Sequence, residues 1–202
     1  MKTLLRIDCS SRTKDSHSRQ MADFFESKWR GSNPKSQVIY RDLANSHIPH
    51  IQEKTISGFY TPEEYMSTEV REATALSDEL IQELEQADEI LISSPMYNLN
   101  IPSSLKAYID QVVRVNRTFK VDHNGYHGLL SGLKAHVLTV KGGSIKGTPL
   151  EKYDFQEPYL QAILGFMGIE LESLFSLEGT SHEEHIEDNV KAVKMKISNR
   201  FN

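Results

Sequence analysis

The sequence predicts a doubly wound α/β fold in which helices cover both faces of a five-stranded parallel sheet. Short apolar or β-branched runs recur along the chain, and amphipathic helical periods separate them. Strands that alternate with helices need crossover connections, and such connections build a parallel sheet covered on both faces. The composition does not change abruptly anywhere along the 202 residues, and no internal repeat or low-complexity segment is evident. We therefore expect residues 1–202 to form a single domain.

Five segments have the length and composition of strands. They are residues 4–8, 38–43, 90–93, 137–140 and 171–175. Between them, apolar side chains recur at the spacing of one helix face. These stripes are Met21, Phe24, Phe25 and Trp29; Ala73, Leu76, Leu80, Leu84 and Ala87; Leu105, Tyr108, Ile109 and Val112; and Ile186, Val190, Val193 and Ile197.

Two helix starts and two long connections are also visible. Pro102 suits the first position of the third helix, where its missing amide hydrogen costs nothing. Ser181 and Glu184 have the spacing of a capping box, which predicts that they open the last helix. The connections 44–68 and 117–133 are long for a compact domain, so we expect them to wall a pocket or a subunit interface.

Composition and charge exclude several functional classes. The chain is 38% hydrophobic and 25% charged, as ordinary globular proteins are, and its net charge of −5 argues against nucleic-acid binding. No apolar run approaches the roughly 20 residues that span a bilayer. Cys9 is the only cysteine, and the apolar stretch at the N-terminus is too short for a signal peptide, so we expect a cytoplasmic protein without a membrane association.

The loop after the first strand, residues 10–18, is rich in hydroxyls and leads into a helix. Amides at a helix N-terminus lack intrahelical partners and carry a partial positive charge, which suits an anion. Ser10, Ser16 and Ser18 can add hydroxyl donors to phosphate oxygens. The alternative is that Asp15, Ser16 and Ser18 only cap the helix.

Two further loops follow strands and would lie at the same sheet edge. In residues 94–102, Pro95 holds Ser94 extended, Asn98 and Asn100 tolerate turn conformations, and Tyr97 offers a flat face. After the fourth strand, Gly142 and Gly143 permit a close approach of backbone to a ligand, although a plain turn is the alternative. Parallel sheets bind ligands at the carboxyl ends of their strands, so the three loops support one site.

Sharper motifs are absent or incomplete. Neither the dinucleotide-binding glycine pattern nor a Walker A motif occurs. The run 182–185 has its second His one position too early for a zinc-binding helix, so no metal site is expected. Cys9 resembles a phosphatase nucleophile by position, but Asp15 stands where such a loop needs an arginine. We therefore expect Cys9 to be a small packed residue.

The three loops together closely resemble those of the FMN-dependent NADH azoreductases and NADH:quinone oxidoreductases, a family with a flavodoxin-like fold. The residues that carry the resemblance are Ser10, Ser16, His17, Ser18, Pro95, Met96, Tyr97, Asn98, Lys141, Gly142 and Gly143. Further matches are residues 41–43, 76–81, 118–119 with 124–125, and 158–160 followed by 164–169. Leu99 replaces an aromatic residue that is usual in the family, and Val140 and Lys141 replace a usual Ser-Arg pair.

The resemblance implies that Ser10, Ser16, His17 and Ser18 take the FMN phosphate and that residues 96–99 border the ribityl chain and ring, with Pro95 also at the cofactor. Residues 140–143 would contact the polar edge of the ring. It implies a flavin that accepts a hydride from NADH or NADPH at N5, so no catalytic side chain is expected. A quinone or azo compound would then take two electrons in a ping-pong reaction, with Tyr97, Asn98 and Phe119 lining its slot.

The resemblance also implies a homodimer, to which residues 59–66 could contribute. The main alternative from another class is a non-enzymatic flavodoxin-like electron carrier, which would not turn over NADH with quinones. A phosphatase of related topology and a flavin-free interaction module are weaker alternatives. The first is opposed by Asp15, and the second requires all three loops to be plain turns.

Overall fold

A computed structural model describes residues 1–181 and 184–201 of the chain. Five parallel strands form one sheet in the order β2-β1-β3-β6-β7. They are β1 (Thr3–Asp8), β2 (Gln37–Asp42), β3 (Glu89–Pro95), β6 (Lys134–Val140) and β7 (Glu170–Leu177). All five coincide with predicted strands, so the predicted doubly wound sheet is confirmed. Each strand begins one to three residues earlier than predicted, and β2 ends one residue earlier.

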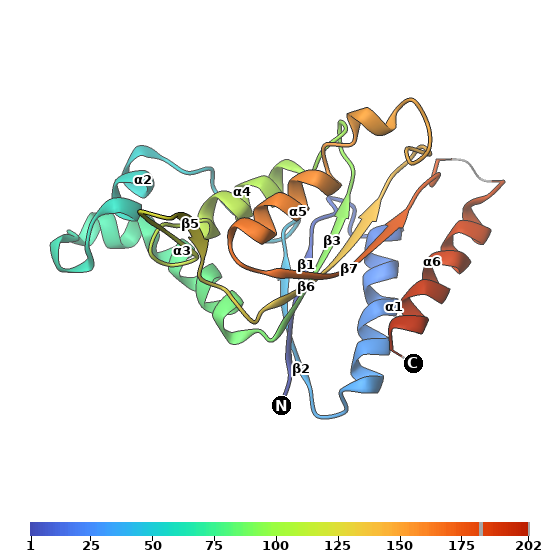
Figure 1. The fold of residues 1–202 in the computed structure, drawn as a ribbon, viewed down its shortest axis with the longest axis horizontal. Helices are drawn as coiled ribbons and strands as arrows, with labels where there is room; N and C mark the ends of the chain where they lie inside the picture. The colour runs from blue at the N-terminus through green and yellow to red at the C-terminus, as the bar shows by residue number, and fades with distance from the viewer. Residues whose placement is uncertain (182–183, 202) are drawn as a thin grey trace.

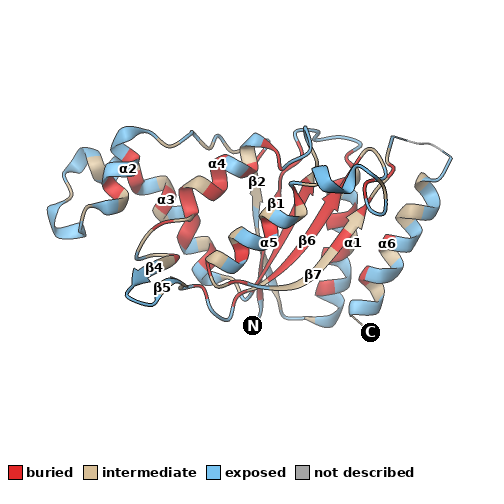
Figure 2. Ribbon diagram, turned by 45° about the horizontal axis from the view of Figure 1, so that its top comes forward, coloured by how far each residue is buried: buried red, intermediate tan, exposed pale blue. Residues whose placement is uncertain are grey.

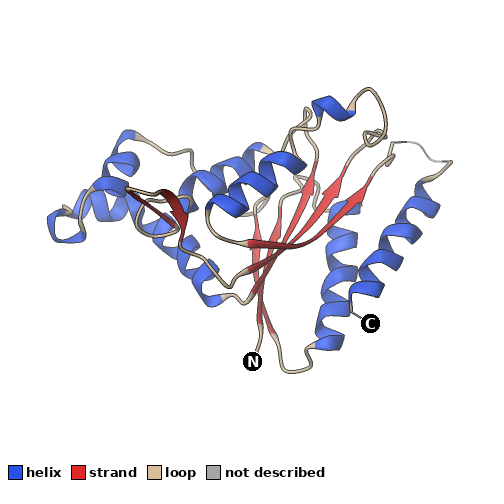
Figure 3. Cartoon of the chain, in the orientation of Figure 1, coloured by secondary structure: helices blue, strands red, loops and turns tan. Residues whose placement is uncertain are grey.

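Helices cover both faces of this sheet (Figure 1). One layer contains α1 (His17–Ser32) and α6 (Ile186–Arg200), which contact each other and the strands β3, β6 and β7. The opposite layer contains α3 (Thr68–Gln86), α4 (Ser103–Val112) and α5 (Glu157–Phe166). The strand arrows all point toward the same edge, where the loops after β1, β3, β6 and β7 gather (Figure 3).

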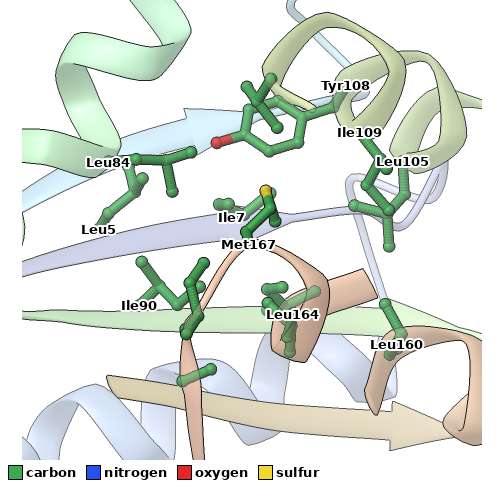
Figure 4. Close-up of a cluster of buried hydrophobic side chains, with 14 of the residues drawn as sticks. Leu5, Ile7, Leu84, Ile90, Leu105, Tyr108, Ile109, Leu160, Leu164 and Met167 are labelled. Carbon is green, nitrogen blue, oxygen red and sulfur yellow. The ribbon is translucent and has the colours of Figure 1, made fainter. Parts of the chain in front are cut away.

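The alternation of side chains along each strand divides the core into two clusters. On β1, Leu4 packs with α1 and α6, whereas Leu5 and Ile7 face α3, α4 and α5. The central strands β1, β3 and β6 are buried along most of their length (Figure 2). The larger cluster joins β1 and β3 to α4 and α5, with Tyr108 and Met167 among its members (Figure 4).

A buried polar network fastens α1 to the sheet. Glu89 accepts a hydrogen bond from Trp29 Nε1 at 2.9 Å, and its Oε2 also lies 2.9 Å from His136 Nε2. Lys2 Nζ lies 2.7 Å from the other oxygen. Burial alone would raise the pKa of Glu89, but the hydrogen bonds from His136, Lys2 and Trp29 outweigh burial and lower this pKa to about 2.

Both long connections contain secondary structure that extends the molecule on the side away from α6 (Figure 1). The first holds α2 (Glu53–Tyr60) and the short 3-10 helix η1 (Glu63–Tyr65); the second holds the hairpin β4 (Phe119–Asp122) and β5 (Gly125–Gly128). Two glycines allow these segments to dock. A Cβ at Gly58 would lie 2.4 Å from Thr74 Cγ2 on α3, and one at Gly128 would lie 2.0 Å from the nitrogen of Gly168.

Of two predicted helix starts, one is confirmed and one was wrong. Pro102 opens α4 from the N-cap position, directly before the first turn, where its missing hydrogen is not needed. The capping box at Ser181 and Glu184 does not form, because α6 begins at Ile186 with His185 as its N-cap. The Ser181 amide instead donates to the carbonyl of Gly142 at 3.0 Å, which holds Ser181 beside the third loop.

The sequence predicts neither a metal site nor a membrane-spanning segment, and both expectations can be compared with the residues that the structure describes. His182 and Glu183, part of the rejected zinc motif, lie outside them. Within residues 1–181 and 184–201, no group of His, Cys, Asp or Glu has the arrangement of a metal site. None of the helices described there combines the length and the apolar character that crossing a membrane requires.

Candidate cofactor site

The loops after β1, β3, β6 and β7 enclose a cavity of about 270 Å³ at the carboxyl edge of the sheet. Nine residues predicted to bind a cofactor line it: Ser10, Ser16, His17, Ser18, Pro95, Met96, Tyr97, Val140 and Gly142. They come from segments more than 40 residues apart in sequence, so the fold brings the three predicted loops together.

Five other predicted residues do not line this cavity. Asn98 and Leu99 form the tip of the second loop, and Gly143 follows the lining residue Gly142. The Lys141 side chain is directed into a buried acidic cluster. Phe119 lies on the hairpin, where its ring packs 4.7 Å from that of Phe166.

The first loop presents hydroxyls at the start of α1. Ser16 is the N-cap, and its Oγ accepts from the Arg19 amide at 3.5 Å and lies 3.1 Å from Ser18 Oγ. Both serines are buried. Because α1 begins at His17, the amides of His17 and Ser18 have no helical carbonyl four residues before them. Ser16 therefore caps α1, while the amides of His17 and Ser18 remain available as donors to a ligand.

The Arg19 side chain holds the first loop in place through hydrogen bonds. Its guanidinium donates to the carbonyls of Ser10 and Arg12, each at 2.9 Å, and to both carboxylate oxygens of Asp42. Burial alone would raise the pKa of Asp42, but Arg19 outweighs burial and lowers it. The carbonyls of Ser10 and Arg12 are thus turned toward Arg19. Asp15 has a positive φ of 53°, and its backbone completes the turn that leads into α1.

The second loop is a tight turn. Tyr97 and Asn100 exchange backbone hydrogen bonds of 2.9 and 3.1 Å, and the residues between them, Asn98 and Leu99, have φ of 50° and 70°. Two consecutive positive φ values are typical of a type I′ turn, which Asn tolerates and Leu does not favour. The Met96 amide donates to the Val140 carbonyl at 2.7 Å, so this turn is fixed to the third loop.

Lys141 anchors the third loop through its side chain. Its ammonium lies 2.6 Å from Asp154, 2.7 Å from Glu157 and 3.4 Å from Glu178, and the residue is 2% exposed. Burial alone would lower the pKa of Lys141, but Asp154 and Glu157 raise it above its ordinary value. Lys141 therefore joins the end of β6 to Asp154, the C-cap of the short 3-10 helix η2 (Glu151–Tyr153), to α5 and to the end of β7.

Four residues that line the cavity were not predicted as site residues. Arg12 and Asp15 bring opposite charges beside the serines, and Thr180 and Ser181 come from the loop after β7. The amides of Thr180 and Ser181 donate to the carbonyls of Lys141 and Gly142. The signal for the last two was present in the sequence, because a polar Gly-Thr-Ser run directly follows the fifth strand and so reaches the same edge.

Cys9 is a packed side chain, as predicted. It is 1% exposed, it does not line the cavity, and its Sγ lies 3.7 Å from the carbonyl oxygen of Ile7. Burial, followed by the charge of Asp8, raises the pKa of its thiol well above the ordinary value. A nucleophilic thiolate is therefore disfavoured at this position.

The strand order and the position of the cavity define a class of protein. In an order of 2-1-3-4-5 the direction of the crossovers reverses between the first and third strands, and ligands bind outside the strand ends at that point. Here Ser10 follows β1, Pro95 ends β3, and the cavity lies between them. The molecule is thus a doubly wound α/β protein of the flavodoxin type, with a cavity where such sheets bind their ligands.

Comparison with known proteins agrees with this class. The model of a family described as having a flavodoxin-like fold matches residues 1–201. An FMN-dependent NADH:quinone oxidoreductase of Nostoc punctiforme is 46% identical over 170 residues, which cover 84% of this chain and 83% of that protein. FMN-dependent NADH:quinone oxidoreductase 2 of Trichormus variabilis is 44% identical over 207 residues, with coverage of 98% and 100%.

Among solved structures, an azoreductase of Bacillus anthracis superimposes with a TM-score of 0.92 over 100% of this chain and 99% of that one, at 23% identity. This likeness concerns the fold. The chain belongs to the flavodoxin-like family and, within it, to the group that includes the two quinone oxidoreductases above.

Proposed function

We propose that this protein binds FMN in the cavity at the carboxyl edge of the sheet and transfers two electrons from NADH or NADPH to quinones and azo compounds in a ping-pong reaction. The observation that carries the proposal is the convergence of three predicted loops on one cavity, with hydroxyls at one end and Tyr97 at the other. The names of the relatives at 46% and 44% identity support FMN, NADH and a quinone.

The hydroxyl end of the cavity fits a phosphate. A hydroxyl can accept two hydrogen bonds and still donate its proton. Ser10 Oγ accepts from the Arg12 amide at 3.2 Å and keeps a proton to donate. Ser16 Oγ accepts from the Arg19 amide and shares one hydrogen bond with Ser18 Oγ, so one of these two hydroxyls keeps its proton for a phosphate and the other gains it when that contact opens. The start of α1 adds a partial positive charge and the unpaired amides of His17 and Ser18. Arg12 supplies a full positive charge, which offsets the negative charge of Asp15 on the same lining.

The other end fits a flat ring. Pro95, Met96 and Tyr97 form one wall, and Val140 and Gly142 form another. A Cβ at Gly142 would lie 2.8 Å from Ser181 Oγ, so the loops approach closely only because this residue is glycine. The Gly142 amide makes no hydrogen bond with the described residues, which leaves it available to a polar ring edge.

When bound, FMN supplies the hydride and electron chemistry, and the chain supplies binding and position. Ser10, Ser16 and Ser18 would hold the phosphate, and residues 95–99 and 140–143 would orient the ring. Lys141 would contact FMN only through its backbone, because its side chain is held by Asp154 and Glu157 and fixes the third loop. The partly exposed Tyr97 and the neighbouring Asn98 would border the position of the second substrate.

We further propose that the protein works as a cytoplasmic homodimer and that residues 1–202 form a single domain. Tyr97 and Leu99 at the second loop are 36% and 41% exposed. A ring placed beside them would remain open to water in one subunit, and a second subunit would cover it. Phe119 would join the substrate slot only in such an assembly, because it does not line the cavity of its own chain.

The test is to purify the protein, load it with FMN, record the visible spectrum anaerobically, and add NADH followed by a benzoquinone. The proposal expects the flavin absorbance to bleach with NADH and to recover with the quinone, over many cycles. An electron carrier without enzymatic activity would bind FMN but would not turn over NADH. Failure to bind FMN would refute the proposal entirely.

A further inference from the structure

Arg19 has an unfavourable position for a cation, because it lies in the first turn of α1. The start of a helix carries a partial positive charge, so acidic side chains stabilise this turn and basic ones do not. The first turn of α1 contains no acidic residue that would compensate. Helix formation alone therefore does not explain Arg19, and its contacts outside the helix point to another role.

Asp42, at the end of β2, fixes the Arg19 guanidinium. Arg19 Nη1 donates to Asp42 Oδ2 at 3.0 Å, and Nη2 donates to Oδ1 at 2.6 Å, which is the paired geometry of Arg with a carboxylate. Asp42 is itself held in place, because its oxygens accept from the Ala44 amide at 3.0 Å and from Asn45 Nδ2 at 2.7 Å. The Arg19–Asp42 pair therefore links α1 to the end of β2 in one fixed orientation.

The remaining donors of Arg19 reach the loop between β1 and α1. Nε donates to the carbonyl of Arg12 and Nη2 to the carbonyl of Ser10, each at 2.9 Å. Within the described residues, the only other hydrogen bond that involves residues 10–15 is an internal one, from the Arg12 amide to Ser10 Oγ. In the described part of the chain, Arg19 is thus the only residue outside this loop that holds it by hydrogen bonds.

These contacts separate the donors of the loop from its acceptors. A phosphate is attracted by amide hydrogens and repelled by carbonyl oxygens. Arg19 does not line the cofactor cavity, so the carbonyls that it binds are directed away from the cavity. The amides of Ser10, Asp15 and Ser16, which do line it, make no hydrogen bond with the described residues. The loop therefore offers donors to the cavity while its two captured acceptors face Arg19.

Arg19 is not placed to bind a ligand itself. Four of the five N–H groups of its guanidinium donate to Asp42 and to the two loop carbonyls. Its charge is balanced by Asp42 and by Asp8, whose Oδ2 lies 3.9 Å from Nη1. Arg19 therefore contributes the position of the loop to the site, and not a free positive charge.

We propose that Arg19 and Asp42 are positioning residues that give the site its selectivity for FMN over riboflavin. This role rests on the proposed function and adds to it the residues that shape the phosphate end. Riboflavin has the ring and the ribityl chain of FMN but no phosphate, so its binding does not use the donors of the first loop. A loop that Arg19 holds in its binding conformation orders fewer residues when FMN binds, which strengthens the binding of FMN alone.

The test compares the binding of FMN and of riboflavin to the flavin-free protein, measured by quenching of flavin fluorescence. Loss of one hydrogen bond to a charged group corresponds to a roughly tenfold to hundredfold change in Kd. We expect Arg19→Gln to raise the Kd for FMN by at least this lower value and to leave the Kd for riboflavin within about twofold. A merely structural effect would weaken both ligands equally.

Two further variants separate position from charge and serve if Arg19→Gln does not fold. Asp42→Asn removes a negative charge near the site, so an effect of charge alone would tighten FMN binding. Asn loses the paired geometry with Arg19, so the proposal expects weaker FMN binding instead. Arg19→Lys keeps the charge but lacks the planar fork that joins Asp42 to two carbonyls, and it should lose most of the affinity that Arg19→Gln loses.

A control and a flavin-free measurement complete the test. Arg30→Gln is the matched control, because Arg30 lies on the same helix, pairs with Glu26 and does not line the cofactor cavity. It should leave both Kd values unchanged. Heteronuclear NOEs of the ¹⁵N-labelled, flavin-free protein report the order of residues 10–15 directly. These NOEs should fall in Arg19→Gln and stay unchanged in Arg30→Gln.

Three outcomes would overturn the positioning role of Arg19 and Asp42. The first is equal weakening of FMN and riboflavin binding by Arg19→Gln. The second is tighter FMN binding by Asp42→Asn, which would make the effect one of charge. The third is a loop that stays equally ordered in Arg19→Gln. Each would leave the proposed function standing, whereas failure of the unchanged chain to bind FMN would refute that function and the selectivity together.

Discussion

Replacing Ser16 and Ser18 together by Ala should weaken FMN binding far more than it destabilises the fold. Both hydroxyls line the cavity at the start of α1, and they lie 3.1 Å apart. A hydrogen bond to a charged group contributes about 1.5–3 kcal/mol, so two such bonds to a phosphate correspond to about 3–6 kcal/mol. Since 1.4 kcal/mol is tenfold, the Kd should rise by roughly 10²–10⁴.

The cost to folding is smaller and can be separated from the effect on binding. Ser16 caps α1 through the Arg19 amide, and the loss of such a cap costs about 1 kcal/mol. Loss of the contact between the two hydroxyls adds about another 1 kcal/mol. For a chain of this size the sum corresponds to a decrease in Tm of roughly 4–8 °C, which leaves a folded protein at room temperature.

Quenching of FMN fluorescence on titration with the flavin-free protein measures the Kd, and thermal unfolding of the same samples measures stability. Ser11→Ala is the matched control, because Ser11 is exposed in the same loop and does not line the cavity. Ser16→Asp should keep the cap but repel a phosphate, so it should weaken binding without lowering Tm. A double variant that binds FMN within twofold of the original chain would refute the phosphate assignment.

Three further predictions concern single residues. Cys9→Ala should leave NADH turnover essentially unchanged, because the thiol is enclosed and does not line the cavity; a folded but inactive variant would restore a nucleophilic role. Because the pKa of Glu89 is about 2 in the folded protein and 4.5 ordinarily, its ionised form stabilises the fold above pH 4.5. On the order of 2 kcal/mol, with solvent screening allowed for, should be lost as the pH falls from 4.5 toward 2. Urea unfolding across this range should show a shallower dependence for Glu89→Gln, and parallel curves would contradict the assignment. Leu99→Gly should raise the free energy of unfolding by about 0.5–1 kcal/mol, because φ of 70° strains Leu and not Gly; a decrease in stability would mean that its side chain packs more than its 41% exposure indicates.

The sheet and the three loops could be predicted because their signals are local. Apolar runs such as residues 137–140 require burial on both faces, and turn residues such as Pro95 and Gly142 mark where the strands stop. Once the strands are parallel, the loops must share an edge, so the cofactor cavity followed from the topology. The turn at Asn98 could also be predicted from a local signal, because Asn tolerates turn conformations.

The features that were missed depend on contacts between distant residues. Lys141 stays a predicted site residue through its backbone, but the destination of its side chain was not predictable, because its partners Asp154 and Glu178 lie 13 and 37 residues away. The wrong cap at Ser181 has a similar cause, since the Gly142 carbonyl captures its amide.

The most direct test of the central claim is a crystal structure of the protein with FMN. We predict the phosphate within hydrogen-bond distance of the Ser16 and Ser18 hydroxyls and the flavin ring against Met96 and Tyr97. A cavity that stays empty at saturating FMN, or a flavin bound at another place on the molecule, would contradict the assignment of this sheet edge as the cofactor site.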